Sequence, residues 1–275
     1  MSRYLMIVEG PHDASMSGVV LLENGFHLET SLQKVDPYWQ TLIPKVFPSG
    51  TKLGHVVQYP DVYVRDQPGN DSCAVIVAGG DSRLLSEMRV ALEILDGSEL
   101  QAISIIADAD DFDAQHRFDQ LVSGLTALNA SHGPGGTDGG SSGLPAFPLT
   151  LPSAPGRFSK GNPNVGIYVM PDNNGPGTLD ALLLECAVTS LPEIYTPACQ
   201  MVATVDAAIA SSDSRFKLLR KPSGKEKASA GVIANLLFPG AALSVAVGKG
   251  AWFGTLTGTE KGISTFRAFV ADLLK

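Results

Sequence analysis

The run from Ile103 to Asp111 constrains the fold more than any other stretch, because an apolar segment there ends in clustered carboxylates. Residues 103–107 form a short segment that is rich in β-branched side chains and almost wholly apolar, which is typical of a strand buried on both faces. Such a strand belongs to a parallel sheet flanked by helices. The ligand-binding crevice of such a sheet lies at its carboxyl edge, so we expect a site where this strand ends.

Two interpretations fit the carboxylates of this run. Asp108 and Asp110 are two residues apart, so on an extended chain their side chains share one side and could hold a divalent cation. Alternatively, Asp110, Asp111 and Asp113 cap the helix that follows, because carboxylates accept hydrogen bonds from the free N–H groups of a first turn. The run alone fits both interpretations.

Three further segments have the composition of buried strands, and each is followed by a segment with helical periodicity. The sequence therefore predicts an α/β fold with a mainly parallel sheet flanked by helices. The predicted pairs are Arg3–Val8 with Ala14–Glu23, Cys73–Ala78 with a helix from about Ser82 to Leu95, and Val165–Met170 with Thr178–Thr189; Ala114–Leu128 follows the central strand.

Two stretches of this region lack clear periodicity. We expect residues 28–60 to be irregular with one hairpin arm, and Val56–Val64 to be an edge strand or a bent pair because it contains Pro60. Residues 130–163 are rich in Gly, Pro and Ser, which predicts a flexible surface loop. Three apolar residues are candidates to anchor part of that loop: Leu144, Phe147 and Leu149.

The C-terminal part is predicted to be mainly helical. Helices are expected at Pro197–Ala210, Glu226–Leu237 and Ser264–Leu274, with a short strand at Ala242–Val247. We predict an α/β domain at residues 1–190 and a helical extension at residues 191–275 that packs on it.

Composition limits the environment and the partners. The first apolar run reaches Glu9 too soon for a signal peptide or a membrane span, and three cysteines without a C-x-x-C pair agree with a reducing compartment. We therefore expect a cytoplasmic protein without membrane contact. The net charge of −8 would repel a polyanion, so nucleic acid would need a local basic patch or bound metal. One such run is present, although charge runs are usually solvated faces: Arg215, Lys217, Arg220, Lys221, Lys225 and Lys227.

Acidic residues recur just beyond the predicted strand ends. Because these ends share one edge of the sheet, the carboxylates are expected to converge there, although helix-dipole compensation alone would account for Asp180. Carboxylates without His or Cys partners favour Mg²⁺ or Mn²⁺ over zinc. The residues are Glu9, Asp13, Asp108, Asp110 and Asp180.

A Gly-Gly turn offers a second kind of site. Gly79 and Gly80 lie between a predicted strand and a predicted helix, where Ser82 begins the first turn. Backbone N–H groups at such a turn can bind a phosphate, although most Gly-Gly turns serve chain geometry alone. No G-x-S-x-G elbow, Walker loop or G-x-G-x-x-G follows a strand, which disfavours hydrolase triads, P-loop nucleotides and dinucleotides.

The order of these motifs resembles a Toprim domain of the OLD nuclease type. The resemblance rests on Val8-Glu9-Gly10-x-x-Asp13, then Gly79-Gly80-Asp81-Ser82-x-Leu84, then Asp108-x-Asp110. More closely, the chain resembles a family of stand-alone bacterial Toprim proteins. Features of that family also present here are Val169-Met170-Pro171-Asp172-Asn173, Gly177-Thr178-Leu179-Asp180 and Lys227-Ala228.

The resemblance implies a role for each matching residue. Glu9, Asp13, Asp108 and Asp110 would ligate one or two Mg²⁺ or Mn²⁺ ions, and Asp180 would complete the second site. Lys227 would lie near the scissile phosphate, with Lys225 or Lys221 as substitutes, and Glu9 could act as general base or acid if one metal binds. The family often has Leu-Glu-Asp where this chain has Leu179-Asp180-Ala181, so one acid is missing and Glu185 is the candidate replacement.

The function that the resemblance implies is a metal-dependent endonuclease acting on DNA rather than RNA, in phage defence or DNA repair. The alternative is a non-catalytic Toprim-fold module that binds nucleic acid or protein through the basic run. A phosphatase or receiver-like protein is a third interpretation, disfavoured because Phe112 stands where that pattern needs Thr or Val. An ATPase or other protein partner and a homodimer are further expectations.

Overall fold

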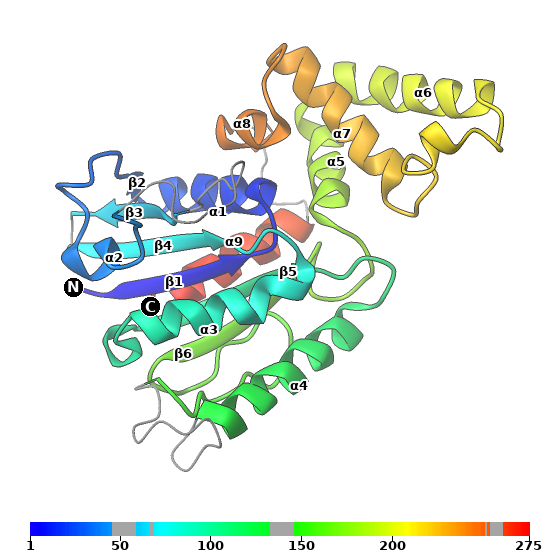
Figure 1. Cartoon of the computed structure of the whole chain (residues 1–275). Helices are drawn as coiled ribbons and strands as arrows, with labels where there is room; N and C mark the ends of the chain where they lie inside the picture. The colour runs from blue at the N-terminus through cyan, green and yellow to red at the C-terminus, as the bar shows by residue number, and fades with distance from the viewer. Residues whose placement is uncertain (46–58, 67–68, 133–145, 251, 254–260) are drawn as a thin grey trace.

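Six strands form one mixed sheet in the order β2-β3-β4-β1-β5-β6 (Figure 1). The computed structural model describes residues 1–45, 59–66, 69–132, 146–250, 252–253 and 261–275. Strands β4, β1, β5 and β6 run parallel, whereas β3 and β2 are antiparallel additions at one edge. The strands are β1 (Arg3–Val8), β2 (His27–Leu28), β3 (Asp61–Arg65), β4 (Asp71–Val77), β5 (Ala102–Asp108) and β6 (Asn164–Met170).

Helices cover both faces of the sheet and extend beyond one end of it. Figure 1 shows α1 and α9 on one face and α3 and α4 on the other, with α5 to α7 beyond the carboxyl ends of the strands. The helices are α1 (Pro11–Glu23), α2 (Pro37–Gln40), α3 (Leu84–Ile94), α4 (Ala114–His132), α5 (Leu179–Ser190), α6 (Pro192–Ala208), α7 (Gly224–Leu237), α8 (Leu243–Gly248) and α9 (Lys261–Leu273).

The sheet separates two hydrophobic cores. Alternate residues of β1 enter opposite cores: Met6 and Val8 face the first, Leu5 and Ile7 the second, and all four are fully buried. Burial of each such side chain stabilises the fold by about 1.5–3 kcal/mol. This two-sided burial explains why the parallel strands are continuous apolar runs.

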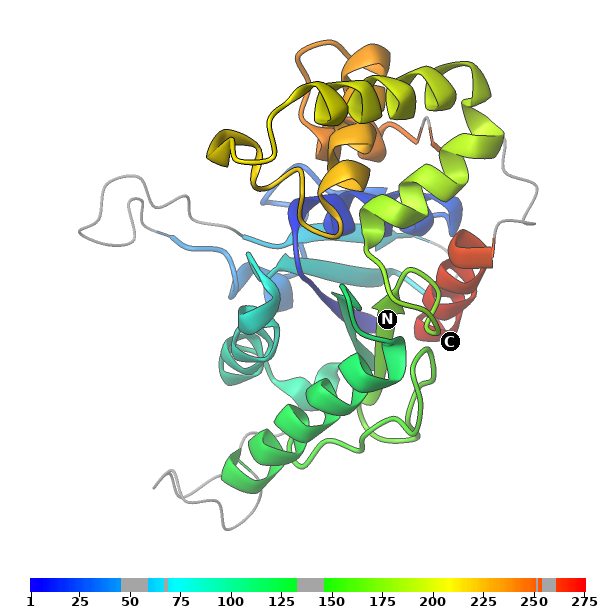
Figure 2. The same cartoon turned by 90° about the vertical axis from the view of Figure 1, so that its right-hand side faces the viewer.

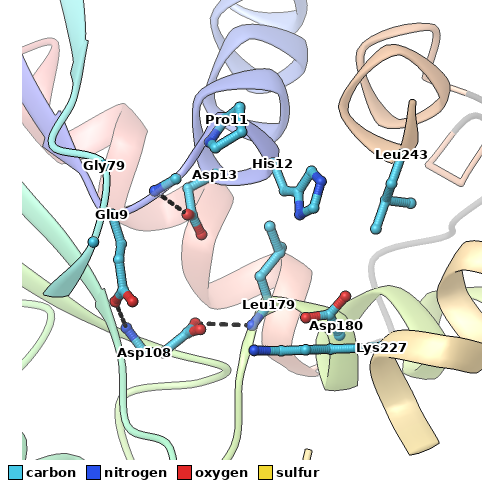
Figure 3. Close-up of a pocket in the computed structure, with 12 residues that line it drawn as sticks. Glu9, Pro11, His12, Asp13, Gly79, Asp108, Leu179, Asp180, Lys227 and Leu243 are labelled. Carbon is cyan, nitrogen blue, oxygen red and sulfur yellow. Dashed lines mark hydrogen bonds between the residues drawn. The ribbon is translucent and has the colours of Figure 1, made fainter. Parts of the chain in front are cut away.

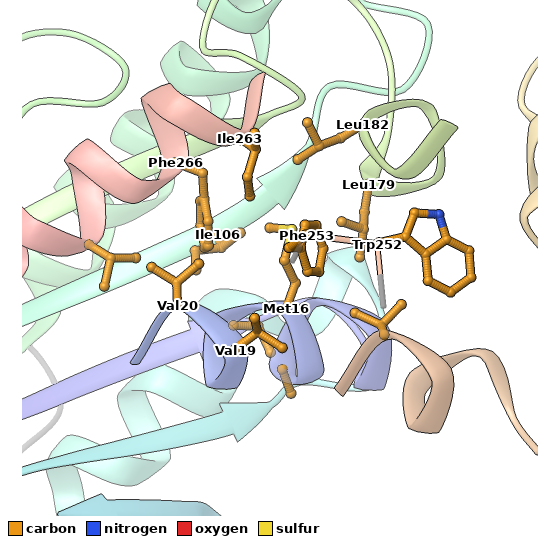
Figure 4. Close-up of a cluster of buried hydrophobic side chains, with 14 of the residues drawn as sticks. Met16, Val19, Val20, Ile106, Leu179, Leu182, Trp252, Phe253, Ile263 and Phe266 are labelled. Carbon is orange, nitrogen blue, oxygen red and sulfur yellow. The ribbon is translucent and has the colours of Figure 1, made fainter. Parts of the chain in front are cut away.

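The first core joins both ends of the chain. Figure 4 shows Met16 and Val20 of α1, Ile106 of β5 and Phe266 of α9 within it. Arg267 of α9 also forms an ion pair with Glu23 of α1. The C-terminal helix therefore packs on the sheet. The predicted division at residue 190 remains a prediction.

The α/β fold with a helical C-terminal region is confirmed, but one predicted element is wrong. Residues 242–247 were expected to form a short strand, whereas Leu243–Gly248 is helix α8. A short apolar run does not distinguish a strand from a buried helical turn by periodicity. Here Ala246 and Val247 are fully buried against the first core, beside α1.

The two stretches without periodicity contain more order than expected. Residues 28–60 include α2, whose Trp39 is fully buried and donates a 2.8 Å hydrogen bond to the Ser72 hydroxyl. In the second stretch, α4 runs to His132, and Phe147 and Leu149 are buried as proposed. Leu144 and residues 56–58 lie outside the described residues.

The prediction of an edge strand at the proline-containing stretch is wrong, because β3 follows Pro60 and pairs antiparallel with β4 on one side and β2 on the other, so that the two-residue β2 forms the edge. Within the described ranges, every helix is too short or too polar to cross a bilayer.

Candidate functional site

A cavity of about 420 Å³ opens at the carboxyl edge of the sheet (Figure 3). It lies where β1 and β5 end and where α1, α5 and α7 begin. The charged residues that line it are Glu9, Asp13, Asp108, Asp180 and Lys227. Four of the five predicted metal ligands and the predicted phosphate-binding lysine are thus brought together.

Glu9 is held at the end of β1 by the turn that follows β4. Its carbonyl accepts 3.0 Å hydrogen bonds from the N–H groups of Gly79 and Gly80. Its carboxylate accepts a 3.4 Å hydrogen bond from the N–H of Asp108, so the first and third motifs are in contact. The side chain of Glu9 therefore points toward the end of β5.

Asp13 lies in the first turn of α1, which begins at Pro11, where the missing N–H of proline costs nothing. Its Oδ2 accepts a 2.8 Å hydrogen bond from the Gly10 N–H, and only 7% of the residue is exposed. The strand-to-helix turn therefore fixes this carboxylate beside the end of β1.

Asp108 connects β5 to the start of α5. Its Oδ1 accepts a 2.9 Å hydrogen bond from the N–H of Leu179, the first residue of the helix. Thr178, the residue before the helix, makes no side-chain capping bond, and its buried hydroxyl has no hydrogen-bond partner among the described residues. The carboxylate of β5 takes over that role.

These hydrogen bonds engage one oxygen each of Glu9 and Asp108, so the second oxygen of each carboxylate is available to a ligand. Within the described part of the chain, no three His, Cys, Asp or Glu side chains already lie at metal-ligand distances. The donor set is all oxygen, which suits a hard cation.

Burial and mutual repulsion make these carboxylates difficult to ionise. Burial, reinforced by Glu9 and Asp180, raises the pKa of Asp13 from 3.8 to about 7. The pKa of Asp108 is raised well above its usual value by burial and by the nearby charges of Asp13 and Glu9. Burial also raises the pKa of Glu9 and of Asp180. A bound cation would relieve this cost.

Two cations lie within electrostatic reach of the acidic residues. Lys227 of α7 lowers the pKa of Glu9 and of Asp180, and Figure 3 shows its side chain extending between Asp180 and Asp108. The second cation, Arg117 of α4, was not predicted. Its side chain is only 11% exposed, it forms an ion pair with Asp81, and it favours the charged form of Glu9. A single Arg on a predicted helix does not indicate from sequence that its side chain will lie near Glu9.

Asp110 lies differently from Asp108. The extended geometry expected at this point does not persist, because Asp110 has a φ of 53° and exchanges backbone hydrogen bonds of 2.9 and 2.8 Å with Gly177. Its exposed side chain lines a neighbouring depression of about 300 Å³ together with Asp111 and Glu226. The charge of Asp110 nevertheless raises the pKa of Glu9, so the two carboxylates are close enough to interact. The role of Asp110 as a metal ligand remains a prediction.

The capping interpretation of the acidic run holds for one residue. Asp113 accepts a 2.6 Å hydrogen bond from the N–H of His116 in the first turn of α4. The side chains of Asp110 and Asp111 accept no hydrogen bond from the described residues. Capping therefore does not account for these two carboxylates.

The Gly-Gly turn contributes to the cavity wall. Both glycines line the cavity, but their N–H groups donate to Glu9, so a phosphate contact would have to come from another group of the turn. Ser82 is exposed and lies outside the cavity lining.

Much of the basic run is neutralised by nearby acids. Arg215 pairs with Asp213, and Lys225 and Arg220 both pair with Asp206. Lys225 and Lys221 do not line the cavity. Glu185, the candidate replacement for the missing acid, is exposed and also lies outside it. Their predicted roles remain predictions, and Lys227 is the lysine that the fold brings to the acidic residues.

The fold and this site define an α/β protein with an acidic cavity at the carboxyl edge of a mainly parallel sheet. The chain belongs to the DUF3226 family, described as "Protein of unknown function", whose model matches residues 3–274. It is similar to a hypothetical protein, PH0156, from Pyrococcus horikoshii OT3, at 17% identity and a TM-score of 0.46, over 100% of this chain and 96% of that one. No curated protein matches the chain.

Proposed function

We propose that this protein is a Mg²⁺- or Mn²⁺-dependent nuclease of the Toprim type, related to OLD nucleases, that hydrolyses phosphodiester bonds of DNA. The observation that carries the proposal is the convergence of Glu9, Asp13, Asp108 and Asp180 with Lys227 in one cavity. The four acids come from three separate stretches of the chain, and their charges oppose one another unless a cation binds.

The metal would be held by Glu9 and Asp108 through their available oxygens, with Asp13 and Asp180 beside them. When bound, Mg²⁺ or Mn²⁺ supplies an activated water and stabilises the charge of the leaving oxygen. The Leu179 N–H holds one oxygen of Asp108 and the Asp108 N–H holds one oxygen of Glu9, which fixes both side chains at the cavity wall.

Lys227 has a separate role in the proposed reaction. Its ammonium group reaches the acidic residues from α7 and can neutralise the negative charge that develops on the phosphate in the transition state. Lys227 is an exposed residue, so a substrate can approach it from solvent. The acids that hold the metal and the cation that meets the phosphate therefore come from different elements.

The test is a titration of Mg²⁺ and Mn²⁺ against cleavage of supercoiled plasmid, linear duplex and single-stranded DNA. Wild-type protein is expected to cleave at least one substrate in a metal-dependent manner. Asp108→Asn should abolish cleavage while circular dichroism shows a retained fold, since the amide oxygen can still accept the Leu179 N–H.

A matched control is Asp119→Asn, because Asp119 is exposed on α4 and lies outside the cavity. It should cleave like wild type. Folded wild-type protein that cleaves no nucleic acid with either metal would contradict the proposal.

A non-catalytic binding module is the second candidate. It is favoured by the absence, among the described residues, of a three-ligand cluster at metal distances. A binding module should keep its affinity for nucleic acid in Asp108→Asn and lose affinity when Lys217 and Lys221 are neutralised. A nuclease should instead lose turnover in Asp108→Asn.

A further inference from the structure

The cavity has a second, less acidic side that the proposed hydrolysis does not use. Figure 3 shows His12 and Leu243 on the side opposite Glu9 and Asp108. His12 comes from the first turn of α1 and Leu243 from the first residue of α8, two helices that pack together. Both side chains are half-buried.

The chemistry of this side suits a flat, partly apolar group. The ring of His12 forms no hydrogen bond with the described residues, and it points into the cavity toward Leu243. An aromatic ring facing an aliphatic side chain is the arrangement in which proteins stack a nucleobase. Lys227 extends past Asp180 toward Asp108 (Figure 3), so a phosphate of the same nucleotide would meet its ammonium group beside the carboxylates.

The size of the cavity limits the substrate. About 420 Å³ falls within the range of about 300–1,000 Å³ found for small-ligand pockets, and so has room for about one nucleotide. In a duplex the bases are paired inside the helix, away from the phosphates. Only an unpaired nucleotide can place its phosphate on the acids and its base against His12.

We propose that His12 and Leu243 form a subsite for the base of the nucleotide whose phosphodiester lies on the acidic residues, so that the protein acts on unpaired DNA. This inference rests on the proposed function for the position of the phosphate. His12 and Leu243 then determine specificity for strand state, while the carboxylates and Lys227 serve the reaction.

The experiment measures binding apart from turnover. Fluorescence anisotropy with Ca²⁺ in place of Mg²⁺ gives the Kd of a labelled single strand and of the blunt duplex of the same sequence. Wild type should bind the single strand at least tenfold more tightly. His12→Ala should weaken single-strand binding by about five- to 150-fold, the range for loss of one stacked base, and change duplex binding less than twofold.

Two variants separate stacking from a structural effect. His12→Phe keeps a ring and should retain most of the single-strand affinity. Val245→Ala is the control on α8, because Val245 is 47% exposed and lies outside the cavity lining. Leu243→Ala should weaken single-strand binding, whereas Val245→Ala should not.

Cleavage in Mn²⁺, measured in parallel, distinguishes the two proposals. Equal binding of single strand and duplex, or an unchanged Kd in His12→Ala, overturns the subsite even where cleavage is observed and the nuclease stands. Selective single-strand binding that falls in His12→Ala, without cleavage in any metal, supports the subsite and contradicts hydrolysis.

Discussion

Replacement of Asp13 by Asn should stabilise the metal-free protein, and the gain should grow with pH. In the unfolded chain Asp13 loses its proton near its usual pKa of 3.8, whereas burial in the folded protein raises this pKa to about 7. Between these values the folded protein binds more protons, so its unfolding free energy falls as pH rises. Well below pH 3.8 both states are protonated and the cost is absent.

The raised pKa corresponds to a total cost of about 4 kcal/mol at pH 8, more than half of which is added between pH 5 and pH 8. Asn cannot ionise and therefore avoids this cost, while its side-chain oxygen can still accept the Gly10 N–H. For a chain of this size the added gain corresponds to about 5–10 °C in Tm.

The assay is thermal and urea unfolding of wild type and Asp13→Asn in EDTA at pH 5, 6, 7 and 8. The quantity of interest is the difference between the two proteins, because titrating groups that do not interact with Asp13 cancel from it. Asp108 does interact with Asp13, so relief of their repulsion adds to the gain at high pH. Asp119→Asn serves as the exposed control and should show a difference that does not change with pH. A flat difference for Asp13→Asn would refute the reasoning that this carboxylate is buried among like charges.

Three further outcomes follow from the same geometry. Mg²⁺ at about 100 times its Kd at pH 8 should raise the unfolding free energy of wild type by about 2.7 kcal/mol, as measured by differential scanning calorimetry. The same Mg²⁺ concentration should stabilise wild type less at pH 6, because protons compete for the carboxylates, and should stabilise Asp108→Asn little at either pH. Lys227→Ala should lower kcat of the cleavage reaction about 10- to 100-fold with a small change in KM. In the same assay Lys225→Ala should keep kcat within about threefold of wild type, because Lys225 pairs with Asp206 outside the cavity. Asp110→Gly should stabilise the fold by about 1 kcal/mol in urea unfolding, because glycine adopts a φ of 53° without strain, and should lose activity if the Asp110 carboxylate binds metal.

The sheet and the main acidic residues could be predicted from the sequence because local pattern and topology agree there. Each parallel strand is buried on both faces, so its apolar run identifies it without a partner. Once the strands are parallel, their carboxyl ends meet at one edge, and Glu9, Asp13 and Asp108 must lie close together. For these residues the spacing along the chain carried enough information.

Other parts depend on contacts that no local pattern contains. Asp110 looked like a partner of Asp108 on one extended strand, but its backbone pairing with Gly177 turns it toward a neighbouring depression. Arg117 is one charged residue of an amphipathic helix, and only the packing of α4 beside β6 and α3 brings it near Glu9. Both positions are set by tertiary contacts.

The start of α7 shows how one such contact can determine the chemistry of the site. Successive helix residues point about 100° apart, so Lys227 enters the acidic cavity while Glu226 lines the depression beside Asp110. A one-residue shift in the start of this helix would place a carboxylate where the cation stands and increase the repulsion among the buried acids. The contacts of α7 with α5 and α8 therefore help to set the charge of the cavity, because they fix which residue of α7 faces the carboxylates.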